Sequence, residues 1–220
     1  MRHVTWRSII SGLVSWLALA APASAEWFTD LYLGGAFTQH SDVTVKSAAG
    51  DTTFKNISFN RSAAFGGRIG YWFESPKVIG LSVDVSHFRP DTVPSSLKRL
   101  DLYMTSMAVE LMLRWPLVVT EAFPRGRLQP FMAGGPAVAL AEAKDTANLT
   151  PPDQYKIDFP PGFQAGAGVA WQLGTHAGLF AEYRFTHFRP EFAFRDRSGA
   201  ATLKTDLNTR YPVGGFSLRF

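Results

Sequence analysis

The last residues of the chain alternate strictly between two chemical classes. Phe216, Leu218 and Phe220 are apolar, whereas the residues between them are Ser217 and Arg219. Successive side chains of an extended strand point to opposite faces, so this segment has one apolar face and one polar face. One interpretation is an ordinary strand at the end of a soluble sheet, which would leave that apolar face in water. The interpretation we favour is the closing strand of a membrane β-barrel, where lipid covers the apolar face and pairing removes the open edges.

The same period-two alternation recurs in segments throughout the chain. Each segment has about the 9–11 residues that a tilted strand needs to cross a bilayer, or somewhat more. Their even number places both chain ends on one side of the membrane. The sequence therefore predicts an all-β fold, an eight-stranded antiparallel up-and-down transmembrane β-barrel. The predicted strands are residues 28–38, 63–73, 78–88, 100–113, 128–141, 163–173, 177–188 and 208–220.

The composition agrees with such a barrel. The mean hydropathy is −0.02, close to zero, because outward and inward residues cancel in any average. The chain contains no cysteine, which excludes disulfides, a lipoprotein anchor and cysteine-based metal sites. Its five histidines are widely spread and have no metal-ligand spacing, so we expect no metal and no cofactor.

The first residues are typical of an export signal. A basic start is followed by an apolar stretch at 9–21, too short to span a bilayer comfortably, and then by Ala23, Ser24 and Ala25. We expect a cleaved signal peptide at 1–25, Sec-type export, and a single barrel domain at 26–220; the alternative is an uncleaved anchor. The formal charge of +4 includes two arginines of this segment, and no basic patch is interleaved with aromatics, so nucleic acid is not an expected partner.

The connections alternate in length. Residues 74–77 and 174–176 read as tight periplasmic turns, whereas 40–62, 89–99, 142–162 and 189–207 read as long, polar extracellular loops. Residues 116–127 break the pattern, because this periplasmic connection is of medium length. Its Leu117-Val118-Val119 run either extends the fourth strand or forms a small cap.

Charged residues fall on the less apolar face of every predicted strand that carries them. An arginine on the lipid face at mid-bilayer would cost about 2–4 kcal/mol, whereas inside a narrow barrel it can pair. We therefore predict a lumen charge network, and two interpretations of it remain open: a structural polar core, or a gated ion path. Eight strands leave an interior that side chains can fill, which favours the first. The predicted network consists of Arg68, Asp84, Glu110, Arg114, Glu182 and Arg184.

A short sequence occurs twice near predicted extracellular strand ends. Ser86-His87-Phe88-Arg89-Pro90 recurs as Thr186-His187-Phe188-Arg189-Pro190. We interpret the pair as a membrane-interface motif in which His87, Arg89, His187 and Arg189 can contact lipid phosphates and the proline ends the strand.

Several of these motifs resemble those of a known family, the small outer-membrane β-barrels that include opacity-type surface antigens and the transmembrane domain of outer-membrane protein A. The similar segments are residues 31–35, 129–136 and 180–185, together with the terminal Gly215, Phe216, Leu218 and Phe220. The resemblance implies that this ending is a signal for the barrel assembly machinery. It also implies a monomer in the outer membrane of a Gram-negative bacterium, in contact with outer-membrane lipid and lipopolysaccharide.

The resemblance leaves the activity open, since one fold hosts many functions. The first expectation is a structural or surface-interaction role through the extracellular loops, whose ligand is unknown. The second is a narrow ion-conducting barrel gated by lumen charge pairs. The third is a lipid A-modifying enzyme using His187, but the lipid A deacylase family has serine two residues after its histidine, where this chain has Arg189. Thr186 is adjacent but is predicted to face the other way, so we expect no enzyme.

Overall fold

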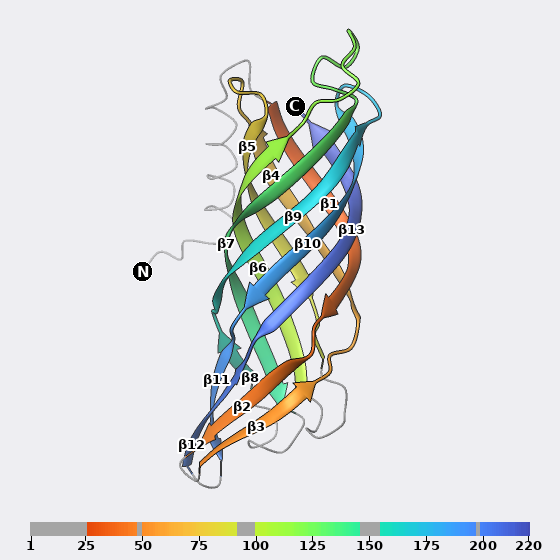
Figure 1. Ribbon diagram of the computed structural model, residues 1–220. Coiled ribbons are helices and arrows are strands. Elements are labelled where there is room, and N and C mark those ends of the chain that lie inside the picture. Colours follow the sequence, from red (N-terminus) through yellow and green to blue (C-terminus); the bar gives the residue numbers. More distant parts are fainter. Residues whose placement is uncertain (1–25, 48–49, 92–99, 146–154, 197–198) are drawn as a thin grey trace, which may run out of the picture.

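The computed structural model describes residues 26–47, 50–91, 100–145, 155–196 and 199–220, and shows the predicted closed antiparallel barrel (Figure 1). The predicted signal peptide at 1–25 lies outside the described residues. Within them, no helix is long and apolar enough to cross a membrane. The eight barrel strands, in their order around the wall, are β1 (Glu26–Thr38), β4 (Ser62–Trp72), β5 (Ile79–Phe88), β6 (Leu100–Arg114), β7 (Leu128–Asp145), β9 (Pro161–Gln172), β10 (Ala177–Phe188) and β13 (Leu207–Arg219).

The barrel closes between its first and last strands. β1 pairs antiparallel with β13, with Leu31 opposite Phe216 and Phe28 opposite Arg219. The Phe220 amide then donates to the Trp27 carbonyl at 2.9 Å. Because this pairing joins the two edges of the sheet, the backbone groups of both edge strands are satisfied within the wall, as lipid requires.

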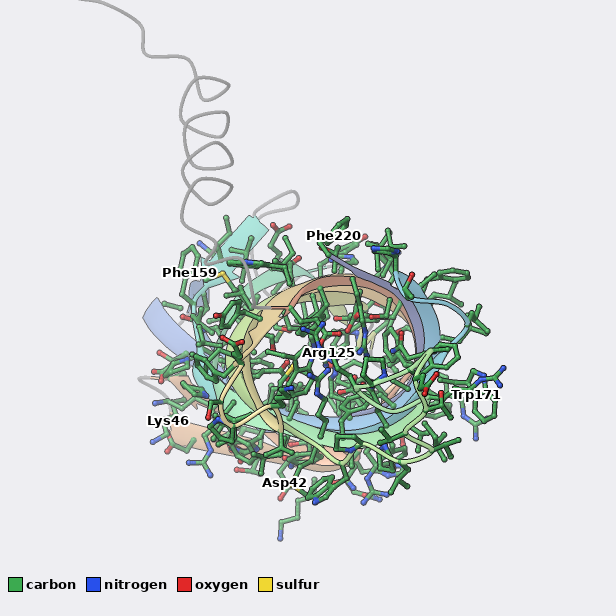
Figure 2. The ribbon with its side chains drawn as sticks, turned by 90° about the horizontal axis from the view of Figure 1, so that it is seen from above. Asp42, Lys46, Arg125, Phe159, Trp171 and Phe220 are labelled. Carbon is green, nitrogen blue, oxygen red and sulfur yellow. The ribbon has the colours of Figure 1, made fainter. Side chains whose placement is uncertain are left out.

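The two faces of the wall differ as the alternation predicts. Leu33 and Phe216 point outward and are 74% and 52% exposed, whereas Arg68 and Glu110 point inward and are 1% and 0% exposed. Trp171 also points outward in the view along the barrel axis (Figure 2). The outer surface therefore presents apolar side chains, and the polar side chains fill the interior.

One end of the barrel, here termed the terminal end, holds Glu26 and Phe220 and carries the short connections. The segment at 115–127 folds over this end rather than simply lengthening β6. Leu117 pairs with Leu128, and a tight turn follows at Thr120 and Phe123. Figure 2 shows Arg125 of this cap above the centre of the barrel. Of the two predicted possibilities, the structure has the cap.

At the opposite, distal end, the wall continues as ordered strands where the sequence predicted polar loops (Figure 1). A short β8 (Tyr155–Asp158) pairs with β7, and a separate four-stranded sheet, here termed the distal sheet, forms beside it. The distal sheet has the order β11 (Glu191–Asp196), β12 (Gly199–Thr205), β2 (Ser41–Ser47) and β3 (Gly50–Ile57).

The distal sheet forms because its strands also alternate, although less visibly than those of the barrel. Val43, Phe192 and Leu203 are buried on one face, while Lys46 and Lys204 are exposed on the other. The many threonine and lysine residues gave these segments a loop-like composition. The short apolar set nevertheless gives the distal sheet one buried face and one charged face.

The division of faces predicts the effect of a charge placed in lipid. Val109 is 52% exposed on the outer face of β6, opposite Val83 of β5. Val109→Arg should lower the free energy of unfolding in lipid vesicles by about 2–4 kcal/mol, because the guanidinium would lie in hydrocarbon. The control is Thr53→Arg, an exposed position on the same face of the distal sheet as Lys46 and Lys204, which should leave stability unchanged in the same urea titration. Equal effects of the two changes would contradict the assignment of the lipid face.

Candidate functional site

The barrel interior is organised around Arg68 of β4. Its Nη2 lies 2.8 Å from Glu182 Oε2, and its Nε lies 3.1 Å from Glu110 Oε2. Asp84 and Asp30 lie further away, at 3.6 and 3.5 Å. One guanidinium thus faces carboxylates from β1, β5, β6 and β10, which are distant in sequence. Because these groups are buried together, each depends on the others to offset the loss of water.

Arg184 of β10 completes this central cluster. Its Nε and Nη2 donate to the two oxygens of Glu182, both at 3.1 Å, in a bidentate geometry. Its Nη1 donates to Asp84 Oδ1 at 2.9 Å and to the Tyr32 hydroxyl at 2.7 Å. The Tyr32 hydroxyl in turn donates to Asp84. The central cluster is therefore a connected network, defined here as Asp30, Arg68, Asp84, Glu110, Glu182 and Arg184.

Among the described residues, the central cluster has four carboxyl groups and only two guanidinium groups. Neutral side chains donate further hydrogen bonds to its carboxylate oxygens. Gln164 Nε2 donates to Asp84 Oδ1 at 3.2 Å and to Glu110 Oε1 at 2.9 Å. Ser82 Oγ donates to Glu110 Oε2 at 3.0 Å. Glu110 Oε1 has Gln164 as its donor, whereas Glu110 Oε2 and Asp84 Oδ1 each receive a neutral donor in addition to an arginine contact, as buried polar groups require.

A second ionic layer, here termed the terminal cluster, lies nearer the cap. Glu26 of β1 accepts a hydrogen bond from Arg219 at 2.8 Å, forms an ion pair with Arg114 at 2.8 Å, and lies 3.5 Å from Arg125 of the cap. Arg114 also lies over the Trp72 ring at 4.2 Å. Of the six residues predicted to form one lumen network, five lie in the central cluster, whereas Arg114 pairs with Glu26 in this separate layer.

Little space remains between the two ionic layers. A cavity of about 20 Å³ lies there, bordered by Asp30, Arg68, Arg114 and Arg219. Such a volume holds about one water molecule. A larger, open vestibule of about 430 Å³ lies at the terminal end, where the cap and Glu26 form part of its lining. The vestibule therefore ends at the terminal cluster.

The distal part of the lumen is chemically different. On the distal side of the central cluster, Ser86 and Ser106 share a hydrogen bond at 2.7 Å, and Thr186 and Tyr211 share one at 3.0 Å. Beyond these pairs the interior is apolar and tightly filled. The fully buried side chains there are Phe88, Leu102, Met104, Phe188 and Leu207.

The two copies of the interface motif have the same local geometry on the outer face. His87 lies against the Phe65 ring with centroids 5.3 Å apart, and its Nδ1 is 2.9 Å from Thr105 Oγ1. His187 lies against the Phe163 ring at 5.6 Å, and its Nδ1 is 2.7 Å from Asn208 Oδ1. In each copy, the two partners are the residues directly opposite the histidine on the flanking strands.

Among the residues that the structure describes, the hydrogen-bond partner of the His187 ring is the Asn208 side chain and not a serine or threonine hydroxyl. The neighbouring Thr186 hydroxyl points into the lumen, where it bonds to Tyr211. Arg189 Nε is held 2.6 Å from Asp206 Oδ1 at the exposed surface. The described residues also contain no group of three histidine or acidic side chains placed to hold a metal ion.

Comparison with known proteins identifies the family. The family model "Outer membrane protein beta-barrel domain" matches residues 11–220. The chain belongs to this family. It therefore resides in the outer membrane of a Gram-negative bacterium. No curated protein sequence matches the chain.

Solved structures show the same fold at low sequence identity. OprG from Pseudomonas aeruginosa superposes with a TM-score of 0.67 at 12% identity, covering 90% of this chain and 97% of that one. AlkL, determined by solid-state NMR in DMPC bilayers, gives 0.57 at 16% identity, with 91% and 92% covered. Neisserial surface protein A gives 0.54 at 12% identity, with 88% and 97% covered. These likenesses concern the fold alone.

Sequence reasoning missed several members of the interior. Asp30 belongs to the central cluster, and Tyr32 and Gln164 form hydrogen bonds with it. Glu26 and Arg219 belong to the terminal cluster. Each of them lies at an inward position of its strand. The alternation of faces could have identified them if the predicted lumen network had included every inward polar residue and not only the charged residues at the strand centres.

The central cluster predicts a large cost for an unpaired charge. Arg68→Met should destabilise the barrel by about 3–5 kcal/mol, since Glu182 and Glu110 would remain buried without their partner. Arg189→Met removes a surface pair whose side chains are 73% and 53% exposed, and should cost no more than about 1 kcal/mol. Urea unfolding of both variants in the same vesicles measures the difference. Similar losses would show that the central cluster is not the stabilising core of the lumen.

Proposed function

We propose that this outer-membrane barrel is a closed, non-conducting membrane anchor that displays its distal sheet for interactions at the cell surface. The observation that carries the proposal is that the chain continues from the barrel strands directly into the strands of the distal sheet. The backbone N–H of Gln39 donates to the backbone carbonyl of Asn208 at 2.8 Å where β1 passes into β2. The distal sheet is therefore joined directly to the hydrogen-bond ladder of the barrel. A surface built this way is held in a fixed orientation relative to the membrane.

The filled lumen supports the anchoring half of the proposal. An ion that crossed the barrel would have to pass the terminal cluster, the central cluster and the apolar distal layer. The central cluster alone is cross-linked by short contacts between four carboxyl groups and two arginines. Disrupting such a network leaves buried charges without partners, which is unfavourable.

The exposed side of the distal sheet supports the interaction half. β3 lies at the edge of the sheet, where the described residues pair it with β2 alone. The Asp51, Thr53 and Lys55 side chains of β3 are exposed, and the charges of Asp51 and Lys55 discourage uncontrolled edge pairing. An exposed edge strand can also accept an extended segment of a partner through main-chain hydrogen bonds.

A conductance measurement tests the closed lumen. In planar lipid bilayers, the purified protein should give no discrete, salt-dependent current steps. Glu182→Ala and Arg184→Ala break the central cluster, and any conductance should appear only in these variants. Discrete steps in the unmodified protein that change in both variants would instead favour the narrow, gated ion path.

The orientation of the distal sheet can be tested on intact cells, because the chain contains no cysteine. Lys46→Cys on β2 should react with a membrane-impermeant maleimide. Arg125→Cys in the cap should react only after the outer membrane has been permeabilised. Labelling of Arg125→Cys alone on intact cells would contradict the surface role.

Adhesion tests the interaction itself. Cells carrying the protein should bind at least one surface coated with fibronectin, laminin or collagen. A variant in which 41–57 is replaced by a short turn should lose this binding. The control shortens 117–127 at the other end and should retain it. Equal binding by cells with and without the protein, on every coating, would contradict the proposal.

A further inference from the structure

A groove runs along the lipid-facing surface of β1, β4 and β5. It forms at Gly67, whose position points outward between Leu31 on one neighbouring strand and Val85 on the other. Because Gly67 has no side chain, the surrounding outward residues enclose a hollow of about 400 Å³. The apolar side chains of its lining are Leu31, Phe65, Ile69, Val83 and Val85.

The groove ends at the first interface motif. His87 belongs to its lining and is the ninth residue of β5 (Ile79–Phe88). A strand crosses the bilayer in about 9–11 residues, so this histidine lies at the level of the outer-leaflet headgroups. Thr105 occupies its Nδ1, and the Phe65 ring holds the imidazole in place. The Nε2 edge is the remaining polar edge of the ring.

Arg89 lies two residues further along the same outward face. Its guanidinium stacks over Tyr103 at 4.4 Å, and its Nη2 lies 3.2 Å from Asp91 Oδ2. Its Nε is buried and has no hydrogen-bond partner among the described residues. Lipid therefore cannot reach this Nε, but the Arg89 side chain as a whole is 40% exposed, so part of its guanidinium is open at the headgroup end of the apolar groove.

We propose that this groove is a specific lipid site that binds one acyl chain of lipid A, with a lipid A phosphate at His87 and Arg89. The membrane already surrounds this face with acyl chains, and the hollow at Gly67 can accept one of them. The arginine and the histidine donate to phosphate oxygens, which form strong charge-assisted hydrogen bonds. The combination of apolar groove and cationic rim matches a phosphorylated lipid rather than a neutral one.

The second interface motif provides an internal comparison. His187 has the same ring contact and the same cross-strand hydrogen bond. However, Ala165 stands in the position equivalent to Gly67, and its neighbour on β10 is Phe185 where β5 has Val85. The Phe163 and Phe185 rings lie 5.8 Å apart and cover this part of the wall. Arg189 pairs with Asp206 at 2.6 Å, as Arg89 pairs with Asp91 at 3.2 Å, so the two copies differ in the groove and not in the pairing of the arginine. The second copy therefore has a similar histidine without the groove.

The experiment titrates the purified full-length protein with bisphosphorylated lipid A and measures binding by native mass spectrometry. Gly67→Leu fills the groove; a Cβ there would lie 3.3 Å from Asp30 O and from Leu31 Cδ2, so only a small shift is needed. Ala165→Leu is the matched control on the second copy. The double change His87→Ala and Arg89→Ala removes the rim, and His187→Ala is its control.

We expect Gly67→Leu and the rim variant each to weaken lipid A binding by at least about tenfold, the size expected for one lost charge-assisted hydrogen bond or its equivalent in apolar contact. Both controls should bind as the unmodified protein does. Lipid A without phosphates should lose the dependence on the rim and keep the dependence on Gly67. Heat-dependent migration on SDS gels checks that each variant is folded, and Gly67→Val replaces Gly67→Leu if the latter fails.

Two results would overturn the proposal. Equal lipid A binding by folded Gly67→Leu and Ala165→Leu would show that the groove holds no acyl chain. The second result is that inorganic phosphate displaces lipid A equally well from the unmodified protein and from Gly67→Leu. It would show that the rim contacts phosphate alone and that the groove is not a lipid site.

Discussion

The contact between Arg68 and Glu182 in the middle of the lumen is the interaction on which the rest of the structure depends. A strand that crosses lipid can place charges on one face only, and that face becomes the inside of the barrel. In a barrel of eight strands, the inside is too narrow for those charges to remain hydrated. They must therefore meet, and Arg68 meets carboxylates from four different strands.

This requirement links the fold to the proposed role. The ionic layers connect strands from both halves of the chain, so they hold the cross-section of the barrel and occupy its channel. The apolar layer around Phe88 and Phe188 continues the filling toward the distal end. A rigid, filled wall can then support a sheet that projects beyond the end of the barrel (Figure 1).

The sequence alone predicted the strands, the two faces and the closure, because each depends on a strict alternation such as that of Phe216, Ser217 and Leu218. The partners inside the lumen were harder to predict. The distance of Arg114 from the central cluster follows from strand register and tilt, which no single strand reveals, and Tyr32 looked like one aromatic among many. The distal sheet was missed because the alternation in β2 and β3 is carried by threonine and lysine, residues typical of loops.

A double-mutant cycle on Arg68 and Glu182 tests the central interaction most directly. Arg68→Met, Glu182→Leu and the double variant would be unfolded by urea in the same lipid vesicles. If the pair holds the lumen together, the loss in the double variant should fall short of the sum of the single losses by about 1–3 kcal/mol. Additive losses would contradict the interaction and show that the two residues are buried side by side without depending on each other.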